Sequence, residues 1–297
     1  MTTPGISRRT VLAGGAALAF LTACSGGDDG DSADATPDDS TPGPDELTGT
    51  LLVLLPPQGV LITDGEQRVP VAVADAEGVP VREGLEPRDF QIRTDTGEPT
   101  VVTVEPHSDG VPTPYYPIRF TPAGAGIHEI TVVDDPGLNA VTLDIGDSTL
   151  IPIPGQALPV EHTPTPANAR GVDPICTRDP ACALHDVDLA DALGAGPVAL
   201  VIATPEFCQT AICGPVLDLV IEALPDYPTI TAIHAEVYAD PSSGDDPRAG
   251  GLAPITDAFA LSFEPTLYLM DATGTVVTRL DSVYDRVELR EALDQIA

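Results

Sequence analysis

Four cysteines in the second half of the chain are the residues best suited to chemistry: Cys176, Cys182, Cys208 and Cys213. A cysteine thiolate is a nucleophile, a metal ligand and one half of a disulfide, so the group allows redox exchange, metal binding or structural bridging. An even number favours two disulfides where the compartment is oxidising. Four cysteines permit three pairings, and the sequence alone does not choose among them.

The N-terminus indicates that this compartment lies outside the cytoplasm. Arg8 and Arg9 precede an uncharged apolar run that is too short to span a bilayer as a mature helix. Ser7-Arg8-Arg9-Thr10-Val11-Leu12 resembles a twin-arginine export signal, and Leu21-Thr22-Ala23-Cys24 resembles a bacterial lipobox. The resemblance implies that residues 1–23 are a cleaved signal peptide. It also implies a lipid on Cys24, which anchors the protein to the extracytoplasmic face of the cell membrane.

The charge of the chain excludes one class of partner. Acidic residues outnumber basic ones by 46 to 13, and the formal net charge is −33. Such a surface repels a phosphate backbone, so we expect no nucleic-acid binding. Residues 24–48 are rich in Gly, Asp, Ser, Thr and Pro and have little to bury, which predicts a disordered acidic linker.

Residues 49–148 are predicted to form an all-β domain. The short runs with β-forming or alternating character are Leu51–Leu55, Val69–Ala74, Phe90–Arg93, Val101–Glu105, Ile118–Thr121, Ile127–Val133 and Val141–Ile145. About seven strands in about a hundred residues are typical of an immunoglobulin-like sandwich, here without a cysteine pair or a core Trp. His107 and His128 are isolated in this pattern, and we expect no metal site there.

A Pro-rich linker over residues 149–165 is predicted to separate this domain from an α/β domain over residues 166–297. Strands are expected where apolar runs are continuous, and helices where apolar residues recur at helical spacing. Asp285 and Glu288 resemble the N-terminal cap of the last helix. The expected elements, in the order β-α-β-α-β-β-α, are Val198–Ala203, Thr210–Leu224, Ile230–Val237, Ala253–Phe259, Thr266–Leu269, Thr275–Leu280 and a helix from Asp285.

Three positions in this order resemble the thioredoxin superfamily. Cys208 stands where a strand meets a helix, Pro215 lies inside that helix, and Glu264-Pro265-Thr266 precedes the final hairpin. The resemblance implies a thioredoxin-like fold over residues 166–297, with no cofactor. It also implies that Pro265 is in cis, lies beside the cysteines and exposes backbone groups that a bound peptide can pair with.

The same resemblance implies that Cys208 is the nucleophile and Cys213 the resolving cysteine. A helix N-terminus stabilises a thiolate through its dipole and unpaired N–H groups. Four residues separate the two cysteines here, whereas thioredoxins have two. In a regular helix this spacing puts the Cα atoms about 8.6 Å apart, and a disulfide needs less than about 7 Å. Either Cys208 lies in the loop before the helix, or the first turn unwinds on oxidation.

Cys176 and Cys182 are predicted to form a local disulfide, because loop ends this close in sequence meet at little entropic cost. The alternative is a cross-pair of Cys182 with Cys208 or Cys213, which would make all four cysteines structural. The sequence thus leaves the connectivity open.

The predicted function is that of a membrane-tethered thiol-disulfide oxidoreductase acting on thiol- or disulfide-bearing exported proteins. The main alternative is a non-enzymatic docking lipoprotein whose cysteines form structural bridges. A peroxiredoxin-like peroxidase is weakened by Thr204, which lies one residue too far from Cys208. Copper delivery requires His185 or His234 to join Cys208 and Cys213, and we assign no metal site.

Overall fold

The structure is a computed structural model that describes residues 48–56, 59–95, 97–208 and 211–297. All of these residues belong to one compact unit, Thr41–Ala297. The predicted signal peptide, the lipid site at Cys24 and all but the last residue of the predicted linker lie outside the described residues. Among the helices that are described, none is long and apolar enough to cross a membrane.

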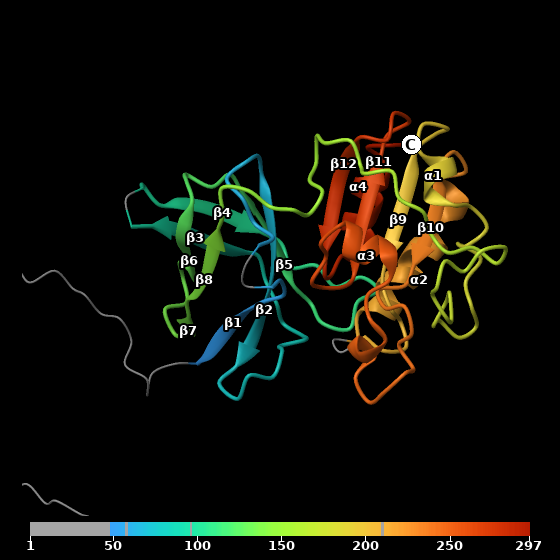
Figure 1. The fold of residues 1–297 in the computed structure, drawn as a ribbon. Helices are drawn as coiled ribbons and strands as arrows, with labels where there is room; N and C mark the ends of the chain where they lie inside the picture. The colour runs from blue at the N-terminus through green and yellow to red at the C-terminus, as the bar shows by residue number, and fades with distance from the viewer. Residues whose placement is uncertain (1–47, 57–58, 96, 209–210) are drawn as a thin grey trace, which may run out of the picture. The chain divides into compact units, whose positions relative to one another are not determined.

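The first part of the chain forms two four-stranded sheets (Figure 1). One has the order β5-β2-β1-β7 and the other β4-β3-β6-β8. Their strands are β1 (Gly49–Val53), β2 (Gln67–Asp75), β3 (Arg88–Thr94), β4 (Thr100–Val104), β5 (Tyr116–Phe120), β6 (Gly126–Val132), β7 (Leu138–Asn139) and β8 (Val141–Ile145). The sequence missed β7, because two residues are too few to show an alternating pattern.

The two sheets share one apolar core, as a β-sandwich requires. Phe90 on β3 meets Tyr116 on β5 edge to face, with ring centroids 5.1 Å apart. Both rings are fully buried, and they join one sheet to the other. The architecture is compatible with the predicted sandwich.

The rest of the chain forms a third four-stranded sheet of order β10-β9-β11-β12. β9 and β10 are parallel, whereas β11 is antiparallel to both β9 and β12. The elements are α1 (Leu189–Ala192), β9 (Val198–Ile202), α2 (Cys213–Ala223), η1 (Leu224–Asp226), β10 (Thr231–Ala235), η2 (Pro247–Gly250), α3 (Pro254–Ala258), β11 (Thr266–Met270), β12 (Val276–Asp281) and α4 (Arg286–Leu293).

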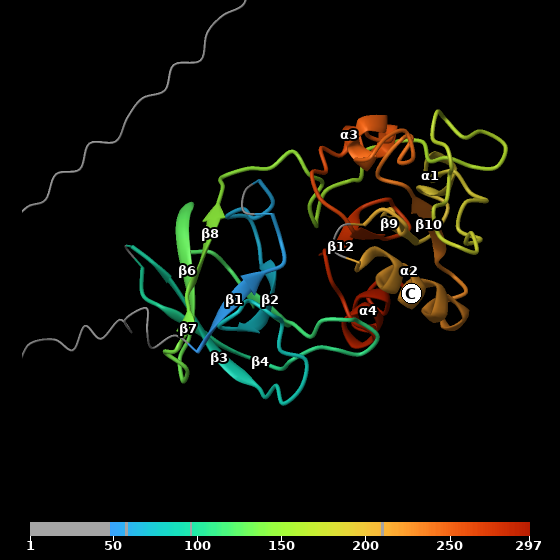
Figure 2. The same ribbon diagram turned by 90° about the horizontal axis from the view of Figure 1, so that it is seen from below.

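Helices cover both faces of this sheet, so β9 is buried on both sides (Figure 2). Ala199 and Val201 pack in the core formed with α2 and α4, whereas Val198, Leu200 and Ile202 pack in the core that contains α1 and α3. A strand buried in this way needs apolar residues at every position, which is what the sequence provides.

The stretch 149–165, predicted as a linker, packs against this sheet instead of standing apart from it. Ile151 and Leu158 are buried in the core beside α1 and α3. The backbone N–H of Val276 donates to Gln156 at 2.8 Å, and Gly155 returns a bond of the same length to Val276. These two bonds attach the segment to the start of β12.

A buried charge network connects α4 to the first part of the chain. Asp285 caps α4 by accepting from the Glu288 backbone N–H at 2.9 Å, which confirms the predicted cap residue. The Glu288 carboxylate does not accept from the Asp285 backbone N–H, which donates to the Tyr115 hydroxyl instead. The carboxylate accepts from Arg68 at 2.6 Å, from Tyr115 at 2.6 Å and from Arg119 at 2.8 Å. Although burial opposes its charged form, Arg68 holds the pKa of Glu288 below its usual value.

Replacing Glu288 with Ala is expected to lower the free energy of unfolding by about 3–5 kcal/mol, because Arg68 would stay buried without its carboxylate partner. Urea denaturation of the full chain measures this change. Glu291→Ala, which removes an exposed carboxylate from the same helix, is the matched control and should cost less than about 0.5 kcal/mol. Equal losses in the two variants would contradict the assigned role of Glu288.

Candidate functional site

Cys208 and Cys213 form a disulfide in the structure, with Cα atoms 6.0 Å apart. Cys208 lies in the loop after β9 and is half-buried, whereas Cys213 is the first residue of α2 and is fully buried. The predicted helix started at Thr210 and α2 starts three residues later. Cys208 therefore lies in the loop before the helix, which is the first of the two sequence-based options.

The local backbone explains where α2 begins. Ala211 has a left-handed φ of 54° and donates its N–H to the Cys208 carbonyl, forming a turn that a helix cannot continue through. Pro215 falls in the first turn of α2, where its missing N–H costs nothing. The positive end of the helix dipole therefore acts on Cys213, and the expectation that Cys208 sits at the helix N-terminus is wrong.

An acidic side chain, Glu264, lies beside this disulfide. Its Oε2 lies 3.5 Å from the Cys213 sulfur and accepts from the Thr204 backbone N–H at 2.7 Å. Burial raises the pKa of Glu264 to about 7. At neutral pH this carboxyl can therefore give or take a proton beside Cys213.

Pro265 follows Glu264 through a cis peptide bond, as the sequence analysis expected, and is buried just before β11. Its carbonyl accepts from the Ser282 backbone N–H at 2.8 Å. This carbonyl is thus already paired within the fold, so it is not one of the groups that the Pro265 loop could expose to a bound peptide.

An apolar cleft of about 410 Å³ opens beside this site. Ile212 and Glu264 line it next to the disulfide, together with Phe263 from the loop before β11. Residues Leu52–Pro56 line its other side. No sequence pattern indicates this cleft, because its walls come from segments far apart in the chain.

Cys176 and Cys182 do not form the predicted disulfide. Their sulfurs are 3.8 Å apart, well beyond a bond of about 2.05 Å, and both residues carry unbonded thiols. Neither of the predicted cross-pairs to Cys208 or Cys213 is formed, because those two are bonded to each other. The expected local bridge is therefore replaced by a different arrangement.

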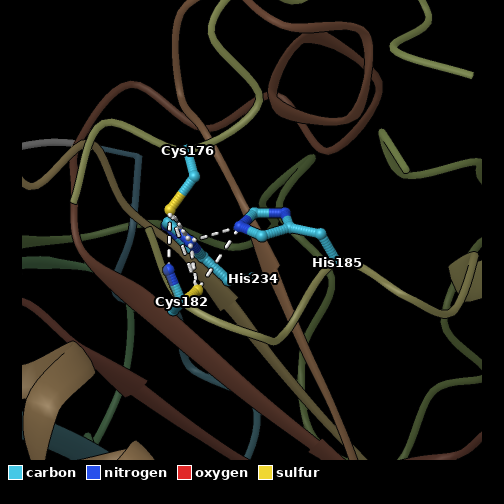
Figure 3. A group of neighbouring side chains, drawn as sticks. All are labelled: Cys176, Cys182, His185 and His234. Carbon is cyan, nitrogen blue, oxygen red and sulfur yellow. Dashed lines mark hydrogen bonds between the residues drawn. The ribbon is translucent and has the colours of Figure 1, made fainter. Parts of the chain in front are cut away.

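That arrangement is a cysteine–histidine cluster of Cys176, Cys182, His185 and His234 (Figure 3). The Cys182 sulfur lies 3.4 Å from both His185 Nε2 and His234 Nδ1. The two histidine nitrogens are 3.2 Å apart, and the Cys176 sulfur lies 3.8 Å from His234 Nδ1. The histidines that copper delivery would have needed beside Cys208 and Cys213 thus gather at the other cysteine pair.

Several hydrogen bonds hold this cluster in place. His234 Nε2 donates to the Ala203 carbonyl at 3.0 Å, which fixes the ring orientation. Cys176 accepts from the Cys182 backbone N–H at 3.4 Å. A hydrogen bond from the Cys182 thiol lowers the pKa of Cys176, so the pair favours one thiolate.

A buried carboxylate ties the loop of Cys176 to β10. Glu236 accepts from the Thr177 backbone N–H at 2.6 Å and from the Thr177 hydroxyl at 3.1 Å. The Thr177 hydroxyl in turn accepts from the backbone N–H of Glu206, at 3.3 Å, in the segment that leads to Cys208. One side chain therefore connects the cluster, the strand and the disulfide loop.

The remaining candidates lie elsewhere. His107 pairs with Asp285 at 2.9 Å, and His128 contacts the Gly126 carbonyl at 3.2 Å. Thr204, considered for a peroxidase, is buried, and its hydroxyl accepts from the Val237 backbone N–H at 2.9 Å.

Comparison with known protein families finds none that matches the chain, and comparison with curated proteins finds no significant match.

Proposed function

We propose that this protein is a thiol-disulfide oxidoreductase whose redox-active pair is Cys208 and Cys213. The observation that carries the proposal is the asymmetry of the two sulfurs. Cys208 is half-buried in a loop, whereas Cys213 is fully buried at the start of α2 with Glu264 beside it. One sulfur can be attacked from outside, and the other can leave into a site equipped to receive it.

A thioredoxin-like fold for the C-terminal sheet and its helices is part of this proposal. It is supported by the order β9-α2-β10-α3-β11-β12-α4, which follows the β-α-β-α-β-β-α order of the resemblance. The position of Cys208 and Cys213 between the first strand and its helix supports it further. Pro265, directly before β11, occupies the place that the resemblance gives to the proline beside the cysteines.

The exchange can be written with its atoms balanced. A substrate thiolate attacks the Cys208 sulfur, a mixed disulfide forms, and the bond between Cys208 and Cys213 breaks. Cys213 leaves as a thiolate, stabilised by the N-terminus of α2, and takes a proton from Glu264. A second substrate thiolate then attacks the substrate sulfur of the mixed disulfide and releases Cys208 as a thiolate, and the two protons lost by the substrate thiols return through solvent to Cys208 and Glu264. The substrate loses two electrons and two protons, and the protein gains them; the reverse sequence reduces or rearranges a substrate disulfide.

The substrates proposed are other exported proteins, met at the membrane surface. The apolar cleft beside Ile212 and Glu264 is suited to an apolar side chain that flanks the substrate cysteine. Attachment through Cys24 would hold the enzyme on the extracytoplasmic face, where protein disulfides form and persist. The acidic surface is expected to disfavour acidic partners.

The first test is redox titration of the full chain in a glutathione couple, with disulfides mapped by mass spectrometry. The Cys208–Cys213 bond should open and close reversibly at a potential above about −300 mV, the range of catalytic rather than structural disulfides. A bond that stays closed throughout the titration would overturn the proposal and favour a docking lipoprotein.

Partner trapping provides the second readout. Cys213→Ala removes the resolving thiol, so the Cys208 thiolate should attack the disulfides of a model substrate such as scrambled ribonuclease, release one substrate thiolate and remain as a mixed disulfide. Cys208→Ala is the matched control and should trap none, because the remaining thiol is buried. Equal trapping by both variants would contradict the assigned order of attack.

The pH dependence tests Glu264. Below a pKa of about 7 the carboxyl is protonated and can donate to the leaving Cys213; above it, the carboxylate repels the thiolate. Reduction of the disulfide by dithiothreitol, expressed per dithiothreitol thiolate, should therefore slow by about tenfold or more as the pH rises through 7.

Glu264→Gln keeps the shape of the side chain but does not titrate, so its rate per thiolate should be flat over the same pH range. A wild-type profile as flat as that of Glu264→Gln would show that Glu264 transfers no proton. A step that persists in Glu264→Gln would assign the titration to another group.

A further inference from the structure

The cysteine–histidine cluster brings two sulfurs and two imidazole nitrogens to one point, and the proposed redox exchange does not use it (Figure 3). All four ligand atoms lie within 4.8 Å of one another. Three of the residues come from a segment without helix or strand, and His234 comes from β10. We propose that Cys176, Cys182, His185 and His234 bind one Zn²⁺ ion as a closed, four-coordinate structural site.

The spacing of the ligand atoms is that of a tetrahedron around zinc. Bonds of about 2.3 Å to sulfur and about 2.0–2.1 Å to nitrogen place two sulfurs about 3.8 Å apart, a sulfur and a nitrogen about 3.6 Å, and two nitrogens about 3.3 Å. The distances here are 3.8 Å between sulfurs and 3.2 Å between nitrogens. Three sulfur–nitrogen pairs are separated by 3.4, 3.4 and 3.8 Å. Five of the six distances are therefore close to those required by one ion bound to all four atoms, and the sixth, between Cys176 and His185, is no more than 4.8 Å.

The hydrogen bond to Ala203 prepares His234 for this role. A carbonyl only accepts, so Nε2 carries the proton and Nδ1 keeps the lone pair that points at the cysteines. Metal-bound histidines commonly donate their second nitrogen to a carbonyl in this way, which fixes the tautomer and the ring.

The ligand set selects zinc among divalent ions. Two thiolates and two imidazoles in a tetrahedral arrangement suit Zn²⁺, and the two thiolate charges balance the charge of the ion. Both histidines are buried and all four positions are filled by protein, so no site remains for a reacting water. The cysteines are only half-buried, which leaves a path for the ion to enter.

The position of the cluster indicates what the ion would stabilise. Between Asp173 and Asp188 the chain has no helix or strand, so a hydrogen-bond ladder does not hold it. Three ligands from this segment and one from β10 would fasten it to the edge of the sheet. Metal sites of this kind contribute directly to folding free energy, because the unfolded chain has no preformed site.

The test is metal binding by the full chain, purified in a phosphine reductant. Elemental analysis should find one zinc per chain. Replacement by Co²⁺ should give the intense visible bands of a tetrahedral ion together with thiolate-to-cobalt charge transfer. Cys182→Ala and His234→Ala should each weaken zinc binding by more than about 100-fold. Removing a residue that only hydrogen-bonds to a ligand lowers metal affinity by about 10–100-fold, and removing the ligand itself should lower it further.

Cys208→Ser/Cys213→Ser is the matched control, since it removes two cysteines from the other site, and it should retain one zinc. Cys182→His keeps four ligands and should still bind Co²⁺, with weaker thiolate-to-cobalt charge transfer. This variant tests the site even if the alanine variants do not fold. Zinc lost from the Cys208→Ser/Cys213→Ser variant would overturn the proposal. The proposal would also be overturned if the reduced chain contained no zinc and showed no thiolate-to-cobalt charge transfer after Co²⁺ was added. The redox titration of Cys208 and Cys213 is independent of this result.

Discussion

Parallel pairing of β9 and β10 is the constraint on which both clusters depend. It aligns Ala235 with Ile202 and brings the carboxyl ends of the two strands to the same edge of the sheet. β11 is antiparallel to β9 and begins at that edge, where Thr266 is opposite Ile202. The loop of Cys208, the end of β10 and the Glu264–Pro265 turn therefore meet in one place. Polar residues from segments up to 87 positions apart, Thr177 and Glu264 by their numbers, come to the same edge of the sheet without any long-range signal in the sequence.

Much of the secondary structure could be predicted because burial leaves a clear pattern. The continuous apolar run of β9 and the helical spacing in α2 and α4 follow from cores on both faces of the sheet. The start of α2 was placed three residues early. Apolar spacing does not reveal a left-handed residue such as Ala211, and an Ala gives no warning of that conformation.

The cysteine–histidine cluster was missed for a different reason. Two cysteines close in sequence, in a chain expected to lie outside the cytoplasm, favour a disulfide, and His234 lies in an apolar strand, which favours a core role. Five residues separate Cys176 and Cys182, which is more than the two to four of familiar zinc motifs. The one signal available was His185, three residues after Cys182. In the sequence Glu264 stands out only as the neighbour of Pro265, because its raised pKa depends on burial that the sequence does not show.

The Thr177 hydroxyl has a consequence for how the molecule opens. It accepts from the Glu206 backbone and donates to Glu236, while the Thr177 N–H donates to the same carboxylate. Pulling the segment of Cys176 away from β10 breaks all three bonds and uncovers the Glu206 amide as well. Amide hydrogens on the two segments should therefore exchange with solvent as one cooperative unit, although about thirty residues of chain separate them. The loop that contains Cys208 should therefore open with the same free energy as the segment that contains Cys176 and Thr177.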